Sequence, residues 1–254
     1  MENKTVINIE MVIEYIEHHL DGKLDLETIA LDSHYSKYHL HRMFTSTTGM
    51  TIHDYVQRRQ LTEAAKLLVF SRKSILEVAL ICGYESQQSF SSAFKSMYKI
   101  TPAEYRNHQE FYPLQLRFTL CRDTKSKEFT RDDICLAEQG DIPAWMELMR
   151  LVIDGYPVMN EDDYQKEITK CIREKRGLVL KQNQILIGAM AYSTSPCSID
   201  FLGIHPQYRN RGLQKLFLDM LLNELLPGQE VAMTTYREGD KADTGYRSLL
   251  KQLG

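Results

Sequence analysis

Apolar side chains recur three and four positions apart through the first 108 residues of the chain, and this spacing predicts helices. The first helix is predicted over residues 9–19 and ends at Asp21-Gly22, a pair that favours a turn. Thr51 and Thr101 are each followed three residues later by an acidic residue, which is the spacing of a capped helix start. Further helices are predicted over residues 26–31, 36–47, 51–70 and 86–97, with two more opening at Ile75 and Thr101.

These helices form one unit that is used twice, with a period of about 50 residues. Each copy is predicted to be a short helix, a tight turn and a second helix with a polar outer face, and Gly83 lies in the turn of the second copy. The matched positions are Leu40, Met43 and Phe44 with Phe90, Ala93 and Phe94, Thr51, Ile52 and Tyr55 with Thr101, Pro102 and Tyr105, and Ala30 and Tyr35 with Ala79 and Tyr84. Two helix-turn-helix copies in one domain suit two successive major-groove contacts on DNA.

The pattern changes in the second half of the chain. Residues 111–120 alternate apolar and polar side chains, which predicts a strand, and residues 123–128 have the composition of a linker. After residue 130, strands alternate with helices, which indicates an α/β or α+β fold. Strands are predicted at residues 134–137, 178–181, 185–193, 198–204 and 231–236, and helices at 144–153, 163–174, 212–225 and 242–253. We therefore predict two domains, an all-α double helix-turn-helix at 1–108 and a mixed-sheet domain at 131–254, joined by 109–130.

Composition narrows the class of protein. The 254 residues are 43% hydrophobic and 26% charged, with no apolar run long enough for a membrane span and a polar N-terminus unlike a secretion signal, so a cytoplasmic globular protein is expected. The five cysteines are scattered, which argues against a metal site or a disulfide framework. The net charge is -3, and residues 1–110 are themselves slightly acidic. This balance disfavours strong non-specific DNA affinity but leaves sequence-specific binding open.

Residues 9–106 resemble the DNA-binding domain of the AraC/XylS transcription regulators. The resemblance rests on Tyr35-Ser36-Lys37-Tyr38-His39-Leu40-His41-Arg42-Met43-Phe44, Gly83-Tyr84-Glu85-Ser86-Gln87-Gln88-Ser89-Phe90, Phe94-Lys95 and Thr101-Pro102-Ala103-Glu104-Tyr105-Arg106. It implies that double-stranded DNA is the partner. It places Tyr38, His41 and Arg42 in one major groove and Gln87, Gln88, Ser91 and Ser92 in the next. Arginine pairs bidentately with guanine, and glutamine with adenine.

A second motif lies at residues 199–214, where a predicted strand enters a turn and an amphipathic helix follows at once. Free amides at a helix N-terminus, with Arg209 and Arg211 beside them, form an anion site. Residues 131–254 resemble the GNAT acetyltransferases, whose acyl-CoA signature is Arg/Gln-x-x-Gly-x-Gly/Ala. The matching residues are Arg209, Asn210, Arg211, Gly212 and Leu213, whereas Gln214 departs from the small residue at the last position.

The GNAT resemblance implies acetyl-CoA or another acyl-CoA as cofactor. The amides of residues 209–214 would hold its pyrophosphate, and the backbone of Leu202, Gly203 and Ile204 would pair with the pantetheine arm. Acetyl transfer needs a base and an acid. Asp200 is the candidate base, and Tyr246 is the candidate acid because Leu250 stands at the position where the family usually has its tyrosine.

Three hypotheses remain open. The chain is a regulator whose second domain transfers acetyl to an unknown amine or senses acyl-CoA; or it is first an amine N-acetyltransferase that controls its own gene; or the second domain is a degenerate binding or oligomerisation module. GNAT proteins usually continue into further strands beyond the position of Gly254, so this domain is either minimal or cut short. The operator, the acceptor, the sign of regulation and the oligomeric state are left open.

Overall fold

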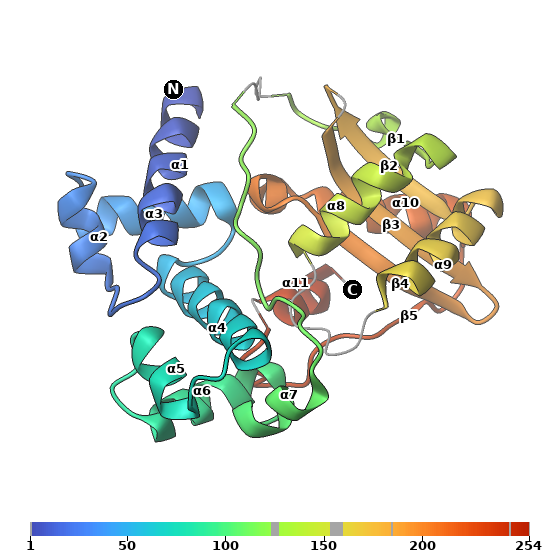
Figure 1. Ribbon diagram of the computed structural model, residues 1–254. Coiled ribbons are helices and arrows are strands. Elements are labelled where there is room, and N and C mark those ends of the chain that lie inside the picture. The colour runs from blue at the N-terminus through green and yellow to red at the C-terminus, as the bar shows by residue number, and fades with distance from the viewer. Residues whose placement is uncertain (1, 123–126, 153–159, 184, 244, 254) are drawn as a thin grey trace. The chain divides into compact units, whose positions relative to one another are not determined.

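The computed structural model describes residues 2–122, 127–152, 160–183, 185–243 and 245–253 (Figure 1). The chain divides into two compact units, which are described one at a time. The first contains residues 2–122 and 239–243, and the second contains the other described residues. The predicted domain limits stay a prediction. Among the described residues, no helix has the length and apolar character needed to cross a membrane.

The first unit is all-helical, as predicted. Its helices are α1 (Glu2–His18), α2 (Leu26–Asp32), α3 (Lys37–Thr48), α4 (Ile52–Phe70), α5 (Ile75–Ile81), α6 (Gln87–Tyr98) and α7 (Pro102–His108). The starts of α2 to α7 are each capped by an Asp, Ser or Thr side chain that accepts a backbone N–H, which satisfies a donor the helix itself cannot pair. Helix α1 begins earlier than predicted, and Val6 is already buried.

Apolar and aromatic side chains fill the interior of both helix-turn-helix copies. Leu40 and Phe44 of α3 are fully buried, and the Phe44 ring lies 5.7 Å from the ring of Tyr55 in α4. In the second copy the Phe94 and Tyr98 rings stack at 4.4 Å, and Tyr105 of α7 meets both edge-on. Most of the residues that the repeat matched are therefore core residues in both copies, whereas the matched Thr51 and Thr101 are half-buried caps and the matched Tyr35 and Tyr84 are half-buried.

Residues 110–122, called the strap, form no strand, so the strand predicted at 111–120 is wrong. The backbone of the strap bonds to helix side chains instead of to another strand. The Thr62 hydroxyl of α4 accepts the N–H groups of Leu114 and Gln115 at 3.1 and 3.0 Å. The alternation is real, because Leu114, Phe118 and Leu120 are buried, but it reflects an extended segment lying on helices.

The second unit contains a five-stranded mixed sheet in the order β1-β2-β3-β4-β5. Its strands are β1 (Ile134–Leu136), β2 (Gly177–Gln182), β3 (Ile185–Thr194), β4 (Cys197–Ile204) and β5 (Ala232–Met233). The first four pair antiparallel, whereas β4 and β5 pair parallel, with Ser198 opposite Ala232 and Ile199 opposite Met233. Strand β5 is shorter than the predicted 231–236 because only these two pairs form.

Helices cover both faces of this sheet (Figure 1). Helices α8 (Ile142–Val152) and α9 (Glu161–Arg173) pack on one face around the fully buried Trp145. Helix α10 (Leu213–Met220) packs on the other face through Phe217 and continues as a π-helical turn over Leu221–Leu225. Helix α11 (Tyr246–Leu253) begins later than the predicted residue 242, because the Ala242 N–H is bonded to the Asp240 carboxylate in a turn.

Candidate DNA-binding surface and candidate second-unit site

Helix α3 presents the first predicted group of DNA contacts. Ser36 caps the helix, and the buried Leu40, Met43 and Phe44 fix which side faces inward. Tyr38, His41 and Arg42 therefore lie on the exposed side, and Tyr38 is 89% exposed. Among the described residues, no carboxylate forms an ion pair with Arg42, so its guanidinium is available to an external acceptor.

Helix α6 presents the second predicted group in the same way. Ser86 caps it, Phe90, Phe94 and Met97 face the core, and the side chains on the other side are polar. Of the predicted contacts, Gln87, Gln88 and Ser92 are exposed and Ser91 is half-buried. The geometry therefore brings each predicted group together on one helix face. Their roles in base reading stay predictions.

Two arginines of α4 are not available to DNA, although both contribute to the formal charge of the first 110 residues. Arg58 is 1% exposed and Arg59 is 7% exposed. The Arg59 guanidinium bonds the Glu17 carboxylate at 2.7 Å, the Glu63 carboxylate at 3.1 Å and the Gln115 carbonyl at 3.0 Å. Arg59 thus joins α1, α4 and the strap, a structural role that sequence analysis missed.

The same cluster contains Tyr55, whose hydroxyl donates to Glu17 at 2.7 Å. Burial raises the pKa of Tyr55 well above its usual value, and the nearby Glu17 charge raises it further. This cluster is part of the core and not of a binding surface. Helix spacing alone could not reveal it, because a polar residue in a helix ordinarily faces solvent.

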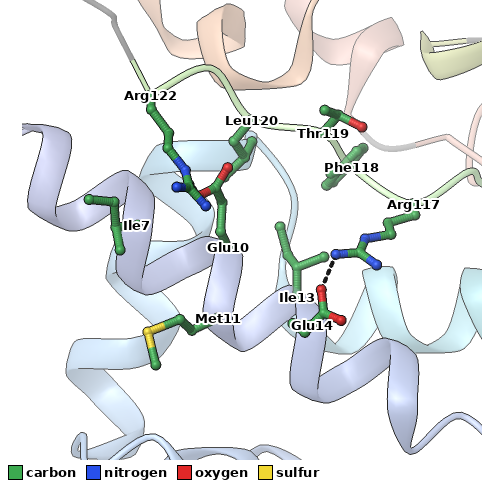
Figure 2. A pocket seen from close by; sticks show the side chains of 10 residues that line it. All are labelled: Ile7, Glu10, Met11, Ile13, Glu14, Arg117, Phe118, Thr119, Leu120 and Arg122. Atoms are coloured by element: carbon green, nitrogen blue, oxygen red, sulfur yellow. Dashed lines mark hydrogen bonds and ion pairs between the residues drawn. The ribbon is translucent and has the colours of Figure 1, made fainter.

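A groove of about 380 Å³ lies between α1 and the strap (Figure 2). Arg117 of the strap pairs with Glu14, and Arg122 pairs with Glu10 at 2.7 Å. Because the strap's own arginines neutralise both carboxylates, the ion pairs fasten the strap to α1. In the part of the chain that the structure describes, no group of three or more His, Cys, Asp or Glu residues has the arrangement of a metal site.

The predicted anion site of the second unit lies where β4 leads into α10. A 3-10 helix over Pro206–Arg211 ends at Gly212, whose φ of 68° starts α10 without a side-chain cap. A Cβ atom at Gly212 would meet nothing within 4 Å, so the space beside Gly212 is open. The Arg211 guanidinium lies 5.0 Å from the Tyr208 ring centre. Gln214 is buried, Arg209 is half-buried, Asn210 is exposed and Leu213 is in the core.

The structure also joins two other predicted groups. The Tyr246 hydroxyl of α11 donates to the Leu202 carbonyl of β4 at 3.1 Å, so the candidate acid contacts the strand expected to hold the pantetheine arm. Burial raises the pKa of Tyr246, which keeps the hydroxyl protonated. Gly203 and Ile204 continue β4 beyond this contact and are buried.

Asp200, the candidate base, accepts hydrogen bonds from the Ser193 and Ser198 hydroxyls at 2.6 and 2.7 Å. The Arg176 guanidinium lies 3.9 Å from its carboxylate. These contacts place Asp200 in a polar group on β3 and β4, and its side chain is exposed. Its catalytic role, like that of Tyr246, stays a prediction.

Two capped recognition helices with exposed polar faces, each preceded by a short helix and a tight turn, define a double helix-turn-helix DNA-binding domain. A family model described as "Helix-turn-helix domain" matches residues 29–108. The Transposon Tn10 TetD protein of Escherichia coli is 42% identical over 101 residues, which cover 40% of this chain and 73% of the relative.

Two further relatives agree with this assignment. Regulatory protein SoxS of Escherichia coli K12 is 38% identical over 99 residues, covering 39% of this chain and 92% of that protein. Right origin-binding protein of the same strain is 35% identical over 145 residues, covering 52% of this chain and 50% of that protein, so the chain spans about half the length of this relative. The chain belongs to the AraC/XylS family and is a sequence-specific DNA-binding transcription regulator.

Proposed function

We propose that the chain is a cytoplasmic AraC/XylS-type regulator whose second unit is GNAT-like and binds acetyl-CoA or another acyl-CoA. The observation that carries the proposal is the early end of the β4–β5 pairing. In the described structure the two strands pair only at Ser198 and Ile199, although β4 continues to Ile204. A strand edge left unpaired offers backbone N–H and C=O groups to an extended ligand.

The order of elements supports the same proposal. One strand, two helices, three antiparallel strands, a helix, a parallel strand and a final helix are the order expected for a GNAT-like domain. Helix α10 follows β4 after the 3-10 helix over Pro206–Arg211, and its start carries the positive end of the helix dipole. The absence of any atom within 4 Å of a Cβ position at Gly212 agrees with an open approach to this helix start.

The residues at this site suit an acyl-CoA, although the Tyr246 hydroxyl already bonds to the Leu202 carbonyl. Arg209 and Arg211 would balance the pyrophosphate charge, and acyl-CoA would supply an activated thioester when bound. The Leu202 carbonyl already accepts the Tyr246 hydroxyl, so a ligand amide that uses this carbonyl must either share it through the second lone pair or displace Tyr246. A displaced Tyr246 would still be protonated near neutral pH, because the ordinary pKa of a tyrosine is about 10, so it would stay available as a proton donor.

Calorimetric titration of the full chain with acetyl-CoA tests the proposal. Gly212→Glu puts a carboxylate at the helix start and should abolish binding of acetyl-CoA. Arg211→Ala removes one cation and should weaken binding. Gly228→Glu is the matched control, because Gly228 has a similar φ of 73° and similarly open surroundings. Absence of binding by a folded wild-type chain would refute the proposal and favour a partner or oligomerisation module.

The second candidate function is amine N-acetyltransfer, which the Tyr246 contact favours. Release of free thiol from acetyl-CoA in the presence of a panel of amines separates it from sensing. Turnover that Tyr246→Phe slows without loss of acetyl-CoA affinity would support transfer, whereas tight binding without turnover would support a sensor.

A further inference from the structure

The two helix-turn-helix turns have the same backbone but different residues at the position of positive φ. His34 has φ 56° in the first copy, and Gly83 has φ 79° in the second. Each donates its N–H to the carbonyl three residues earlier at 3.2 Å, to Leu31 and Leu80 respectively. Since histidine adopts the conformation in the first copy, the backbone angle alone does not explain glycine in the second.

A close approach explains it. A Cβ atom at Gly83 would lie 2.4 Å from the carbonyl oxygen of Gly22 and 2.8 Å from its carbonyl carbon. Gly22 lies in the loop between α1 and α2, which leads into the first copy. The turn of the second copy therefore rests directly on the backbone that precedes the first. Backbone atoms cannot move aside as the end of a flexible side chain can.

Gln60 holds this contact from the helix that connects the copies. Its side-chain amide, in α4, donates to the Gly22 carbonyl at 2.8 Å, and Gln60 is 9% exposed. The Gln57 side chain, from the same helix, lies near the hydroxyl of Tyr84, the residue that follows Gly83. An exposed ion pair of 3.3 Å between Lys23 and Glu85 joins the same two loops.

We propose that Gly83, the Gly22 carbonyl and Gln60 form a spacing junction that fixes the separation of recognition helices α3 and α6. These are positioning residues, since none of them is among the predicted base contacts. One added base pair shifts the second half-site by about 3.4 Å and rotates it by about 35°. A rigid junction makes the chain select one half-site separation, and a looser junction makes it accept several.

The test measures spacing selectivity and not affinity alone. Duplexes that bind the full wild-type chain are first selected from a random pool and footprinted, and one base pair is then added or removed between the two footprints. Wild type should lose about tenfold or more in affinity on either change. Gly83→Ala should bring this ratio close to one, whereas His34→Ala, at the equivalent position of the first copy, should keep the wild-type ratio.

A second pair of variants tests the same junction in case Gly83→Ala does not fold. Gln60→Ala removes the bond to the Gly22 carbonyl and should also relax spacing selectivity. Gly22→Ala should not, because a Cβ there meets nothing within 4 Å and the carbonyl stays in place. A wild-type chain indifferent to spacing would overturn the proposal. So would an equal loss of affinity at every spacing in the folded Gly83→Ala or Gln60→Ala variant.

Discussion

Replacing Arg59 by methionine removes the cation that joins α1, α4 and the strap. The Arg59 side chain is 9% exposed and the side chain of its partner Glu17 is 11% exposed, so solvent screens the pair weakly. The variant leaves the Glu17 carboxylate buried with only the Tyr55 hydroxyl as a described partner, and it leaves the Gln115 carbonyl without the Arg59 donor. Breaking a buried pair on one side costs about 3–5 kcal/mol, and we expect a loss of that size for the first unit.

The chain provides separate probes for its two units. The helices of the first unit contribute the larger part of the far-ultraviolet circular dichroism, whereas the only tryptophan, Trp145, is fully buried in the second unit. In urea unfolding of the full chain, Arg59→Met should shift the dichroism transition to lower denaturant and reduce the extrapolated free energy of unfolding. Tryptophan fluorescence controls for damage to the second unit.

A double-mutant cycle distinguishes a buried pair from general loss of packing. Glu17→Leu combined with Arg59→Met removes both charges, so it should cost less than the sum of the two single variants, by about 0.5–3 kcal/mol. A dichroism-detected loss below about 1 kcal/mol for Arg59→Met alone would refute the reasoning, because it would mean that the pair is solvated or that Glu17 finds another partner.

Three further outcomes are expected. Arg42→Ala should weaken binding to selected duplexes by about 1–3 kcal/mol and relax preference at one base pair, whereas a uniform loss across sequences would assign Arg42 to a phosphate. Gly188→Ala puts a Cβ atom 2.8 Å from Ile204 and Phe217 atoms and should cost the second unit about 1–3 kcal/mol by tryptophan fluorescence, whereas Gly140→Ala, in open space, should be neutral. The pKa values of Glu77 and Glu104 are lowered, that of Glu77 first by the Ser74 backbone N–H and that of Glu104 first by the Thr101 hydroxyl. The stabilisation that the two charged carboxylates give the first unit is therefore complete above the usual carboxyl pKa and is lost as pH falls through the lowered values. In the double variant Glu77→Gln and Glu104→Gln, the free energy of unfolding of the first unit should therefore fall less steeply as the pH is lowered.

The helices of the first unit could be predicted from sequence because their signals are local. A capping residue such as Thr51 lies three residues from the N–H that it bonds, and the core positions of α3 and α6 repeat at three and four. The exposed faces that carry Arg42 and Gln88 follow from the same spacing. The repeat then showed that the unit occurs twice, and the family comparison agrees.

The remaining features depend on contacts between residues far apart in the chain. An alternating segment predicts a strand from sequence, and the pattern is the same when its backbone bonds to a helix side chain instead of to another strand. In the strap, the backbone bonds to Thr62, some fifty residues away. From the sequence, Gln60 and Arg59 are expected to be ordinary surface residues of a helix. Only the fold shows that Gln60 contacts the Gly22 loop and that Arg59 pairs with Glu17. Likewise, the sequence explains why Gly83 tolerates a positive φ, but not the carbonyl that lies against it.

The strap has a consequence for handling the protein. Residues 114–120 alternate large apolar side chains, contain no proline and carry a single charge, Arg117, which is the composition of a segment prone to cross-β association when released. In the folded first unit its buried side chains and its bonds to α4 keep it from pairing with another chain. Release of the strap is therefore the step at which we expect aggregation to begin. A fragment that ends after α7 would remove this segment, but it would also uncover Thr62 and the rings of Tyr98 and Tyr105 that the strap contacts.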